Sequence, residues 1–428
     1  MNILLIGNGG RENAIAWKIC NSESYINSNS TLYCSNGNPG LNNFAEPVNL
    51  KPTQFKELIQ FCTDKHIELT IVGPEIPLSL GIVNEFEKNG LKIFGPSKEA
   101  AEIESSKVFS KELMTENNIP TAKFKKFSKY KIPEAEKFFE DCSYPVVIKA
   151  DGLAAGKGVI IAEDKHKAIS TLIDLTEREI FGDSGFNFIA EEFLSGEEVS
   201  VFVITDGDDY VILPYSQDHK KIGEGDTGNN TGGMGAVAPV LKFMTDDLQS
   251  KIKSKIIEPV LKALKADGRK FKGCLYCGLM IVDNEPYVIE FNCRFGDPET
   301  QAVLPLIKSD FLEMLMASAE ERMSGYKLET NDKFSCCVVM SSGGYPGDYE
   351  TGKIITGTVT DSESVLVFHS GTKKSDNGEI LTNGGRVLSV TGVSGDSLEK
   401  AVETAYQKVS EIDFENKYYR KDIGSKLY

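Results

Sequence analysis

The sequence predicts a multidomain protein of mixed α/β and α+β class that begins with a parallel sheet. The chain has 428 residues, enough for roughly three domains at about 150 residues each. Short apolar runs alternate with amphipathic runs in the N-terminal quarter, which is typical of βαβ units. The C-terminal quarter, residues 325–428, has the pattern of a mixed β domain with a helix near Ser397–Ile412.

An N-terminal α/β domain is expected over residues 1–103. Its predicted strands are Ile3–Ile6, Thr31–Cys34, Leu69–Val72 and Lys92–Phe94, and its predicted helices are Arg11–Ile19, Thr53–Lys65 and Pro77–Asn89. Each strand ends in a turn rich in glycine, asparagine or proline. Because ligands bind at the carboxyl ends of parallel strands in open sheets, we expect part of the site there.

The first turn, GNGGRE at Gly7–Glu12, exposes backbone N–H groups at the start of a helix. Such a helix start favours a phosphate, and Arg11 adds a positive charge. The third glycine of a dinucleotide fingerprint is missing, because Glu12 stands in its place, and Thr31–Cys34 is not followed by a ribose-binding acid. A nicotinamide site is therefore disfavoured, and a purely structural turn is the alternative.

A second domain is expected over residues 104–324, with a smaller β-rich unit at about 121–189. A helix is predicted at Ser105–Asn117 and a polar loop at Ser216–Gly235. The predicted strands are Val146–Ala150, Gly158–Ala162, Phe188–Leu194, Glu198–Ile204, Cys274–Val282 and Pro286–Asn292, and the other helices lie near Lys165–Thr176, Asp247–Asp267 and Asp310–Met323.

A glycine-rich segment, DGLAAGKGV at Asp151–Val159, joins two of these strands. Gly152, Gly156 and Gly158 allow close approach of a polyphosphate to the backbone, and Lys157 adds a positive charge. The spacing is not that of a Walker motif. A glycine loop between two strands forms a hairpin that can move as a lid over a nucleotide.

Lys149 stands inside the apolar strand VVIKA, immediately before the glycine loop. A buried lysine is costly unless it meets an anion, so we expect a phosphate contact; an edge strand with the lysine in water is the alternative. Further on, AEEFLSGEEVS places acids around the turn Ser195–Gly196. Backbone groups there suit an adenine edge and an acid suits ribose hydroxyls, although acids beside a turn are usually solvated.

The segment VIEFNCRFGDPET carries the strongest metal signal. Alternate residues of a strand share a face, so Glu290 and Asn292 should point the same way, with Arg294 next if the strand continues. A carboxylate and an amide oxygen suit magnesium, which completes its shell with phosphates and water. Arg294 would then clamp a carboxylate or phosphoryl oxygen. A polar edge strand is the alternative.

Composition excludes several classes of protein and partner. Charged residues are 26% and hydrophobic residues 40% of the chain, and no apolar run approaches the roughly 20 residues of a membrane span. The net charge of −16 disfavours nucleic-acid and anionic-membrane partners. The opening NILLIG lacks the basic region and cleavage site of a signal peptide. Together with nine cysteines, this predicts reduced thiols in the cytoplasm; a monomer is expected.

Together these segments resemble one family. The whole chain resembles the phosphoribosylamine–glycine ligases, also called glycinamide ribonucleotide synthetases, of the ATP-grasp superfamily. The matching motifs are GNGGRE, VGPE, KIFGPS, VIKADGLAAGKGV, EEFLSGEE, SQDHK, DTGNNTGGMGA, EFNCRFGDPETQ, GGYPGDY, TNGGRVL and RKDIG. The most diagnostic is RFGDPETQ, Arg294–Gln301. Because the chain ends soon after RKDIG, it is more similar to the single-function enzymes than to the fused eukaryotic forms.

The resemblance implies an ATP-grasp core with a mobile lid at about 121–189, and flanking domains that complete the substrate side. The implied ATP contacts are Lys107, Lys149, Gly156, Lys157, Gly158, Glu191, Glu192, Phe193, Leu194 and Glu198. Of these, Glu191 and the Phe193–Leu194 backbone would hold adenine and Glu198 the ribose. The implied ligands of Mg²⁺ or Mn²⁺ are Glu290 and Asn292, without the third acid that many ATP-grasp ligases have, because CLYCGLM offers none.

The resemblance further implies catalytic roles for Arg294 and Lys149. The implied substrate contacts are Gly9, Gly10, Glu75, Asp218, Lys220 and Arg294. The implied reaction joins glycine to 5-phosphoribosylamine with ATP, giving glycinamide ribonucleotide, ADP and phosphate through glycyl phosphate, a step of de novo purine (IMP) biosynthesis. The alternatives are another ATP-grasp ligase or carboxylase of a purine intermediate, which RFGDPETQ disfavours, and a non-catalytic nucleotide-binding regulator.

Overall fold

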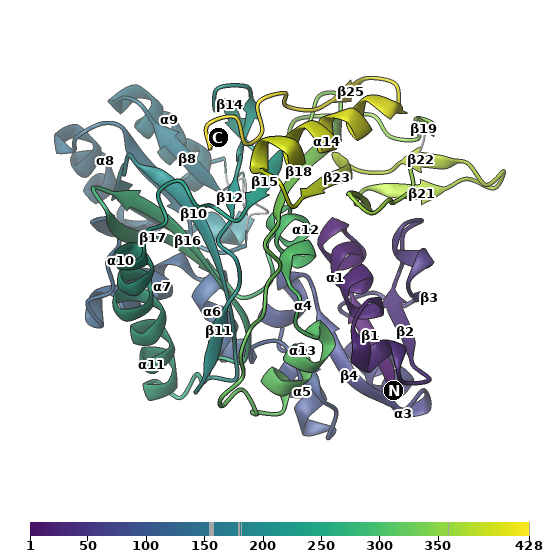
Figure 1. Ribbon diagram of the computed structural model, residues 1–428. Coiled ribbons are helices and arrows are strands. Elements are labelled where there is room, and N and C mark those ends of the chain that lie inside the picture. The colour runs from purple at the N-terminus through teal and green to yellow at the C-terminus, as the bar shows by residue number, and fades with distance from the viewer. Residues whose placement is uncertain (154–157, 179, 181, 358, 428) are drawn as a thin grey trace.

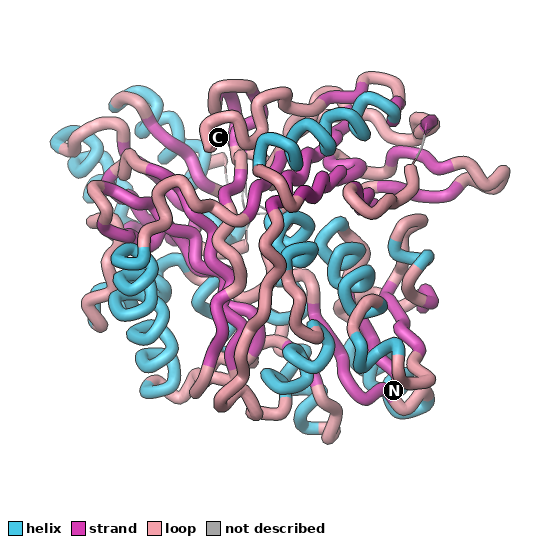
Figure 2. The backbone as a smooth tube through the Cα atoms, viewed as in Figure 1, coloured by secondary structure: helices cyan, strands magenta, loops and turns pink. Residues whose placement is uncertain are grey.

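The computed structural model describes residues 1–153, 158–178, 180, 182–357 and 359–427. Figure 1 shows the N-terminal domain and the central sheet side by side, with the C-terminal domain across the top of both. Figure 2 shows that long loops connect these parts. Among the described residues, no helix combines the length and the apolar character that crossing a membrane requires.

The N-terminal sheet has five parallel strands in the order β3-β2-β1-β4-β5. Its strands are β1 Asn2–Ile6, β2 Thr31–Ser35, β3 Glu46–Val48, β4 Ile67–Val72 and β5 Ile93–Phe94. Its helices are α1 Gly10–Cys20, α2 Glu23–Ile26, α3 Phe55–Asp64, α4 Glu75–Ser79 and α5 Ile82–Lys88. The predicted parallel α/β sheet is confirmed, and its apolar strands are buried because helices cover both faces.

Two details of this domain differ from the prediction. Strand β3 was missed, because EPV is a short edge strand with two exposed residues and no apolar alternation. The helix predicted at Pro77–Asn89 is two helices, α4 and α5. They are separated at Gly81, whose φ of +90° lies in the left-handed region. Glycine adopts this conformation readily, but it interrupts a right-handed helix.

The central sheet is antiparallel, in the order β11-β10-β16-β17. Its strands are β10 Glu197–Thr205, β11 Tyr210–Ile212, β16 Gly273–Val282 and β17 Glu285–Asn292. The helices α6 Lys98–Ser105, α7 Lys107–Glu116, α10 Asp246–Ile252 and α11 Glu258–Ala266 cover one face, with a π-helical turn at Lys253–Ile257 between the last two. That face buries Val201, Leu279 and Phe291 in the largest core cluster. The opposite face buries Phe202 and Tyr276 in a second cluster, and its open part, around Glu290, is left for the site.

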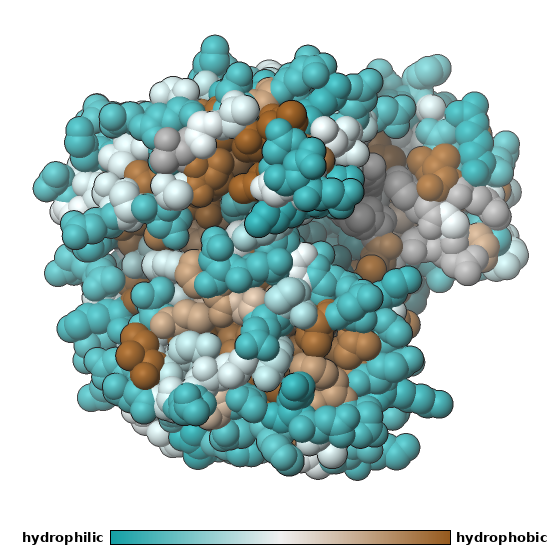
Figure 3. Space-filling view, turned by 90° about the vertical axis from the view of Figure 1, so that its right-hand side faces the viewer, coloured by the Kyte–Doolittle hydropathy of each residue, from teal (hydrophilic) through white to brown (hydrophobic). Residues whose placement is uncertain are grey.

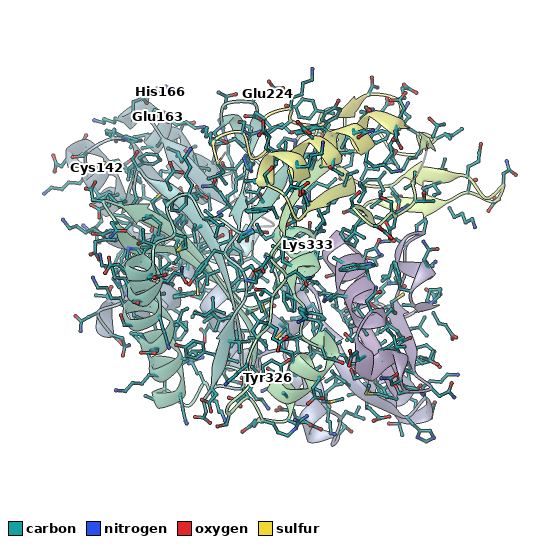
Figure 4. The ribbon with its side chains drawn as sticks, viewed as in Figure 1. Cys142, Glu163, His166, Glu224, Tyr326 and Lys333 are labelled. Carbon is teal, nitrogen blue, oxygen red and sulfur yellow. The ribbon has the colours of Figure 1, made fainter. Side chains whose placement is uncertain are left out.

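The predicted β-rich unit is a separate sheet with the order β6-β9-β7-β8, here called the lid sheet. It consists of β6 Phe124–Ser128, β7 Val146–Ala150, β8 Val159–Ala162 and β9 Asn187–Glu192, with η2 Lys129–Lys131, η3 Gly182–Gly185 and helices α8 Ile132–Asp141 and α9 Lys165–Thr176. Phe127, Phe139 and Phe188 pack together in its own core. Figure 4 places Cys142, Glu163 and His166 on the outer part of this unit.

The C-terminal sheet follows the order β12-β15-β18-β23-β20, and β25 pairs with β18. Its strands are β12 Gln217–Asp218, β15 Gly235–Ala238, β18 Phe334–Ser342, β20 Val365–His369, β23 Arg386–Ser394 and β25 Lys417–Tyr418. Helix α14 Leu398–Glu411 packs on it. The smaller pairs are β13 Lys221–Gly223 with β14 Thr227–Asn230, β19 Thr356–Gly357 with β24 Ile412–Asp413, and β21 Thr372–Lys374 with β22 Ile380–Thr382.

The loop predicted at Ser216–Gly235 is wrong in part, because it contains β12, β13 and β14. These strands are short and polar, so hydrophobic periodicity does not reveal them. Helices α12 Glu299–Val303 and α13 Phe311–Ala319, with η5 Leu304–Leu306 between them, connect the central sheet to the C-terminal sheet. The face turned to the viewer in Figure 3 is mostly hydrophilic, with apolar residues gathered in a few places.

Candidate active site

The open face of the central sheet carries the predicted metal ligands. Glu290 pairs with Gly278, which in turn pairs with Ser200, and Asn292 pairs with Tyr276. Directly paired residues of antiparallel strands project to the same face, and the two pairs are two residues apart along β16. Glu290 and Asn292 therefore share one face, as predicted. A side chain at Gly278 would place its Cβ 3.3 Å from Glu290 Cγ, so glycine makes room for this carboxylate.

A β-bulge in β17 lies beside Glu290. Leu279 pairs with Val288 while Gly278 pairs with Glu290, so Ile289 is an extra residue without a partner in the ladder. The carbonyl oxygen of Ile289 accepts a hydrogen bond of 3.0 Å from Lys149 Nζ. The bulge thus supplies an acceptor for a lysine of the lid sheet.

Lys149 is buried at 3% exposure, as expected for a functional lysine, but its anionic partner within the chain is Glu191. Glu191 lies on the neighbouring strand β9 and also forms an ion pair with Lys111 of α7, with 2.5 Å between Oε2 and Nζ. Each carboxylate oxygen of Glu191 therefore faces an ammonium group of the chain, and the adenine contact implied for Glu191 stays a prediction. Lys111 was missed; its only signal in the sequence is its position one helical turn after Lys107.

The start of the glycine loop is tied to α7. Asp151 Oδ1 accepts hydrogen bonds of 3.1 Å from both Ser106 Oγ and the Val108 backbone N–H, and so caps the helix. Lys107 Nζ donates to the carbonyl oxygen of Gly152 at 3.1 Å. On the far side of the loop, the carbonyl oxygen of Gly158 accepts from Ala150 N at 2.9 Å. Gly156 and Lys157 lie outside the described residues.

Glu290 lies in a strongly positive environment. Burial alone would raise the pKa of its carboxyl group, but Lys220, Lys149, Lys107 and Arg294 together hold that pKa below its usual range. The closest of these measured is Lys220, whose Nζ lies 3.9 Å from Glu290 Oε1. Glu290 is therefore ionised at neutral pH and surrounded by cations that suit a polyanion.

Lys220 also reaches the predicted ribose contact, Glu198, with 3.4 Å between Nζ and Oε2. Burial would lower the pKa of Lys220, but Glu198, Tyr276, Glu290 and Asp218 raise it well above its usual value. Asp218 Oδ1 is buried without a hydrogen-bond partner among the described residues. Burial raises the pKa of Asp218 well above its usual value. The structure thus brings Glu198, Asp218 and Lys220 to the same face as Glu290.

Arg294 lies beyond the end of β17 and connects it to the N-terminal domain. Its Nε lies 3.2 Å from Glu75 Oε2 and its Nη2 lies 3.1 Å from Glu104 Oε1. Burial alone would raise the pKa of Glu75, but Arg294 and Arg11 hold it below its usual range. Arg294 was expected on the face of Glu290 and Asn292 only if the strand continued, and the strand ends at Asn292. Glu104 on α6 was missed, since its partner is distant in the sequence.

The first glycine turn has less room for a substrate than predicted. The Gly9 N–H donates to Glu12 Oε2 at 2.6 Å, so this donor is already used. A Cβ at Gly10 would lie 2.7 Å from Gln301 Nε2 and would also strike Ser370 of the C-terminal domain. Gly10 is therefore closely packed against the later domains. The side chain of Glu12, which replaces the third glycine of the fingerprint, occupies the space within the turn.

The segment after β9 holds the remaining predicted ATP contacts. Glu192 closes the lid sheet, since its N–H donates to the Lys123 carbonyl at 3.0 Å and its Oε1 accepts from Lys123 N at 2.9 Å. The side chain of Glu192 is thus engaged with the backbone. Phe193 is 42% exposed, and Phe193 and Leu194 lie between β9 and β10, outside the strand ladders.

Gly196 allows this segment to turn tightly into β10, and its replacement gives a stability prediction. A Cβ at Gly196 would overlap the backbone oxygen of Ile281 and lie 3.3 Å from Val282 Cγ2. Gly196→Ala should therefore destabilise the protein by about 1–3 kcal/mol, because backbone must move. Thermal unfolding checks this, with Gly395→Ala as control, since nothing lies within 4 Å of a Cβ there. Equal midpoints for the two variants would contradict the packing described.

Comparison with known proteins identifies the family. Models of phosphoribosylglycinamide synthetase match nearly the whole chain: the N domain at residues 1–104, the ATP-grasp (A) domain at 105–300 and the C domain at 335–426. The phosphoribosylamine–glycine ligase of Caldanaerobacter subterraneus is 47% identical, over 99% of this chain and 100% of that protein. That of Escherichia coli is 43% identical, over 99% and 98% respectively.

Solved structures agree with this assignment. The phosphoribosylamine–glycine ligase of Thermotoga maritima superposes with a TM-score of 0.83 at 33% identity, over 99% of this chain and 100% of that one. The biotin carboxylase domain of the Hydrogenobacter thermophilus 2-oxoglutarate carboxylase shares the fold, with a TM-score of 0.74 at 15% identity over 97% and 91%. The chain belongs to the phosphoribosylglycinamide synthetase family and is an ATP-grasp ligase.

Proposed function

We propose that this chain joins glycine to 5-phosphoribosylamine at the expense of ATP, giving N1-(5-phosphoribosyl)glycinamide, ADP and phosphate in purine biosynthesis. The observation that carries this proposal is the full-length similarity to ligases of that name, 47% identical over 99% of the chain. The site supports it, because four cations surround the ionised Glu290. Such a face attracts the phosphates of ATP and of a phosphorylated sugar.

Glu290 and Asn292 fit a magnesium or manganese ion. The ionised carboxylate and the amide of these residues stand on one sheet face, and such hard oxygen donors suit a cation that takes its other ligands from phosphates and water. When bound, the cation would neutralise charge on the phosphates and polarise the γ-phosphoryl group. Neither face neighbour on β16, Gly278 or Tyr276, adds a carboxylate, so the protein supplies few of the ligands.

In the proposed first step, a carboxylate oxygen of glycine forms a bond to the γ-phosphorus and the bond from that phosphorus to ADP breaks. In the second step the amine of phosphoribosylamine bonds to the glycyl carbonyl carbon, phosphate leaves with the carbon–oxygen bond pair, and the nitrogen loses a proton. Lys107 and Lys149 would hold the ATP phosphates, and Arg294 would stabilise the acyl phosphate and the oxyanion. No nucleophile of the chain is required.

The remaining substrate and ATP contacts stay proposals. Lys220 would meet an anionic group beside Glu290, and Glu75 and Asp218 would face the glycine and ribosylamine side. Phe193, Leu194 and Glu198 would hold the nucleoside. We propose cytoplasmic action as a monomer on small molecules, and the net charge of −16 disfavours nucleic acid and anionic membranes.

The alternative is another ATP-grasp ligase or carboxylase of the purine pathway, and substrate omission separates the two. The purified protein should release ADP continuously only with ATP, Mg²⁺, glycine and phosphoribosylamine all present. Leaving out glycine or phosphoribosylamine should stop sustained release. ADP release that requires bicarbonate in place of glycine would contradict the proposal.

A further inference from the structure

Lys111 is a buried lysine for which the proposed reaction has no role. It lies on α7 one turn after Lys107 and is 2% exposed. Its Nζ lies 2.5 Å from Glu191 Oε2 and donates a hydrogen bond of 2.6 Å to Thr121 Oγ1. The ring of Phe124 lies 5.8 Å from the ammonium. Burying a charged lysine this deeply costs free energy unless the ammonium group is paired. The contacts with Glu191 and Thr121 provide that pairing.

Glu191 is the link between Lys111 and Lys149. Its Oε2 faces Lys111, and its Oε1 forms an ion pair with Lys149 on β7. All three side chains are nearly inaccessible to water, at 2%, 3% and 4% exposure for Lys111, Lys149 and Glu191. Two ammonium groups share one carboxylate, so the trio keeps one positive charge in excess. This charge lies immediately before the glycine loop, where a polyphosphate would benefit from it.

Lys149 has three N–H donors. Among the described residues, two of its acceptors are Glu191 and the bulged carbonyl of Ile289. No third acceptor of Lys149 is found among the described residues, so one N–H donor is left for a ligand. If Lys111 were absent, Glu191 would keep its ion pair with Lys149 and lose the one with Lys111. The remaining pair of Glu191 and Lys149 would have no net charge.

Lys111 also contacts the segment that leads into the lid sheet. The hydroxyl that accepts from Lys111 belongs to Thr121, which itself donates to the Val288 carbonyl at 2.7 Å. The Val288 N–H donates to the Pro120 carbonyl at 2.8 Å. Lys111 therefore contacts one acceptor of Lys149, Glu191, directly. It is connected to the other acceptor, Ile289, through Thr121 and the neighbouring residue Val288 of β17.

We propose that Lys111 is a positioning residue for nucleotide binding, which shares Glu191 so that Lys149 retains a donor and a net positive charge for the phosphates of ATP. The inference rests on the proposed function in one respect, because it takes Lys149 as a phosphate contact. In this proposal Lys111 acts through its contacts with Glu191 and Thr121 and not through contact with substrate or metal.

The ionisation of Lys111 supplies an additional test. Burial lowers its pKa to about 8, Glu191 and Glu192 of β9 oppose that shift, and Lys149 of β7 adds to it. Lys111 is protonated below this pKa and neutral above it. The excess charge of the trio therefore disappears as pH rises through about 8, and phosphate binding should weaken over that range.

The experiment compares Lys111→Met, Lys111→Arg and wild type. Lys111→Met should raise the Kd for the Mg²⁺ complex of a non-hydrolysable ATP analogue, and the KM for ATP, by about tenfold or more, with kcat changed much less. The inhibition constant of adenosine, which lacks phosphates, should stay unchanged. Lys111→Arg keeps the charge and should recover most of the affinity. The Met variant is expected to fold, because Glu191 still has Lys149 and methionine fills a similar volume.

A matched control is Lys126→Met, because Lys126 lies nearby on β6 in an exposed ion pair with Glu112, at 61% side-chain exposure. It should change none of these constants. The affinity of wild type for the analogue should fall between pH 7 and 9. It should fall less in Lys111→Met and in Lys111→Arg, because methionine does not titrate and arginine stays protonated, and any fall that remains is assigned to Lys107, whose pKa is also lowered by burial. If Lys111→Met does not fold, equal pH profiles for wild type and Lys111→Arg overturn the proposal.

Two other results would also overturn it: unchanged analogue binding in Lys111→Met, with or without a lower melting temperature, or equal weakening of the analogue and adenosine. The binding measurements need no turnover. A wild type that binds the analogue but does not ligate glycine would therefore refute the proposed function alone, and the role of Lys111 would still be decided separately.

Discussion

Glu290→Gln should lower kcat/KM by on the order of a hundredfold at limiting magnesium and leave the fold intact. The substitution keeps the shape of the side chain but removes the charge that would hold the cation. The side chain lies on the open face of the central sheet, opposite the apolar face that packs on helices, so the core is not disturbed. Steady-state kinetics as a function of magnesium concentration provide the measurement.

Glu285→Gln is the matched control for this substitution. Glu285 lies on the same strand, but it is 39% exposed and pairs with Lys251 and Lys255 at the surface. Its loss should leave the magnesium dependence unchanged. If Glu290→Gln behaves like Glu285→Gln at limiting magnesium, Glu290 is not a metal ligand.

Arg294→Lys should bind ATP nearly normally and yet form product about a hundredfold more slowly. The guanidinium of Arg294 contacts Glu75 through Nε and Glu104 through Nη2, so two different nitrogens join α4 and α6 to the end of β17. The single ammonium of lysine cannot reproduce this fork. The same substitution also weakens stabilisation of the acyl phosphate and the oxyanion, the role proposed for the arginine.

Arg269→Lys serves as a comparison, because Arg269 also contacts two carboxylates, those of Glu102 and Asp267, but lies away from the sheet face at 24% exposure. It should keep wild-type turnover. An Arg294→Lys variant with normal kcat and a raised KM for ATP would place Arg294 at the nucleotide instead.

The sequence predicted the helices and strands whose own residues show a clear apolar periodicity. Strand Val146–Ala150 and helix Lys165–Thr176 were predicted at their observed bounds, and the shared face of Glu290 and Asn292 followed from strand alternation. Strands β13 and β14 were missed, because their residues are polar and their pairing depends on partners rather than periodicity. The bulge at Ile289 was missed, because a bulge cannot be derived from alternation alone.

Side-chain partners were the hardest to predict. Glu191 was assigned to adenine only through the family resemblance, and its ion-pair partners, Lys111 and Lys149, are far away in the sequence. Glu104 was missed for the same reason, since Arg294 is its partner. The close approach of Gln301 and Ser370 of later domains to Gly10 was not predicted either, and the substrate contact of Gly10 stays a prediction. Such contacts are set by tertiary packing and leave little local signal.

The most direct test of the proposed reaction follows the oxygen atoms of glycine. Glycine labelled with heavy oxygen in both carboxylate positions should transfer one labelled oxygen to inorganic phosphate and keep the other in the product amide. This is expected because the carboxylate oxygen that attacks the γ-phosphorus later leaves with phosphate. Mass spectrometry of phosphate and product after complete turnover measures both. Unlabelled phosphate, or label in AMP, would contradict the glycyl-phosphate route.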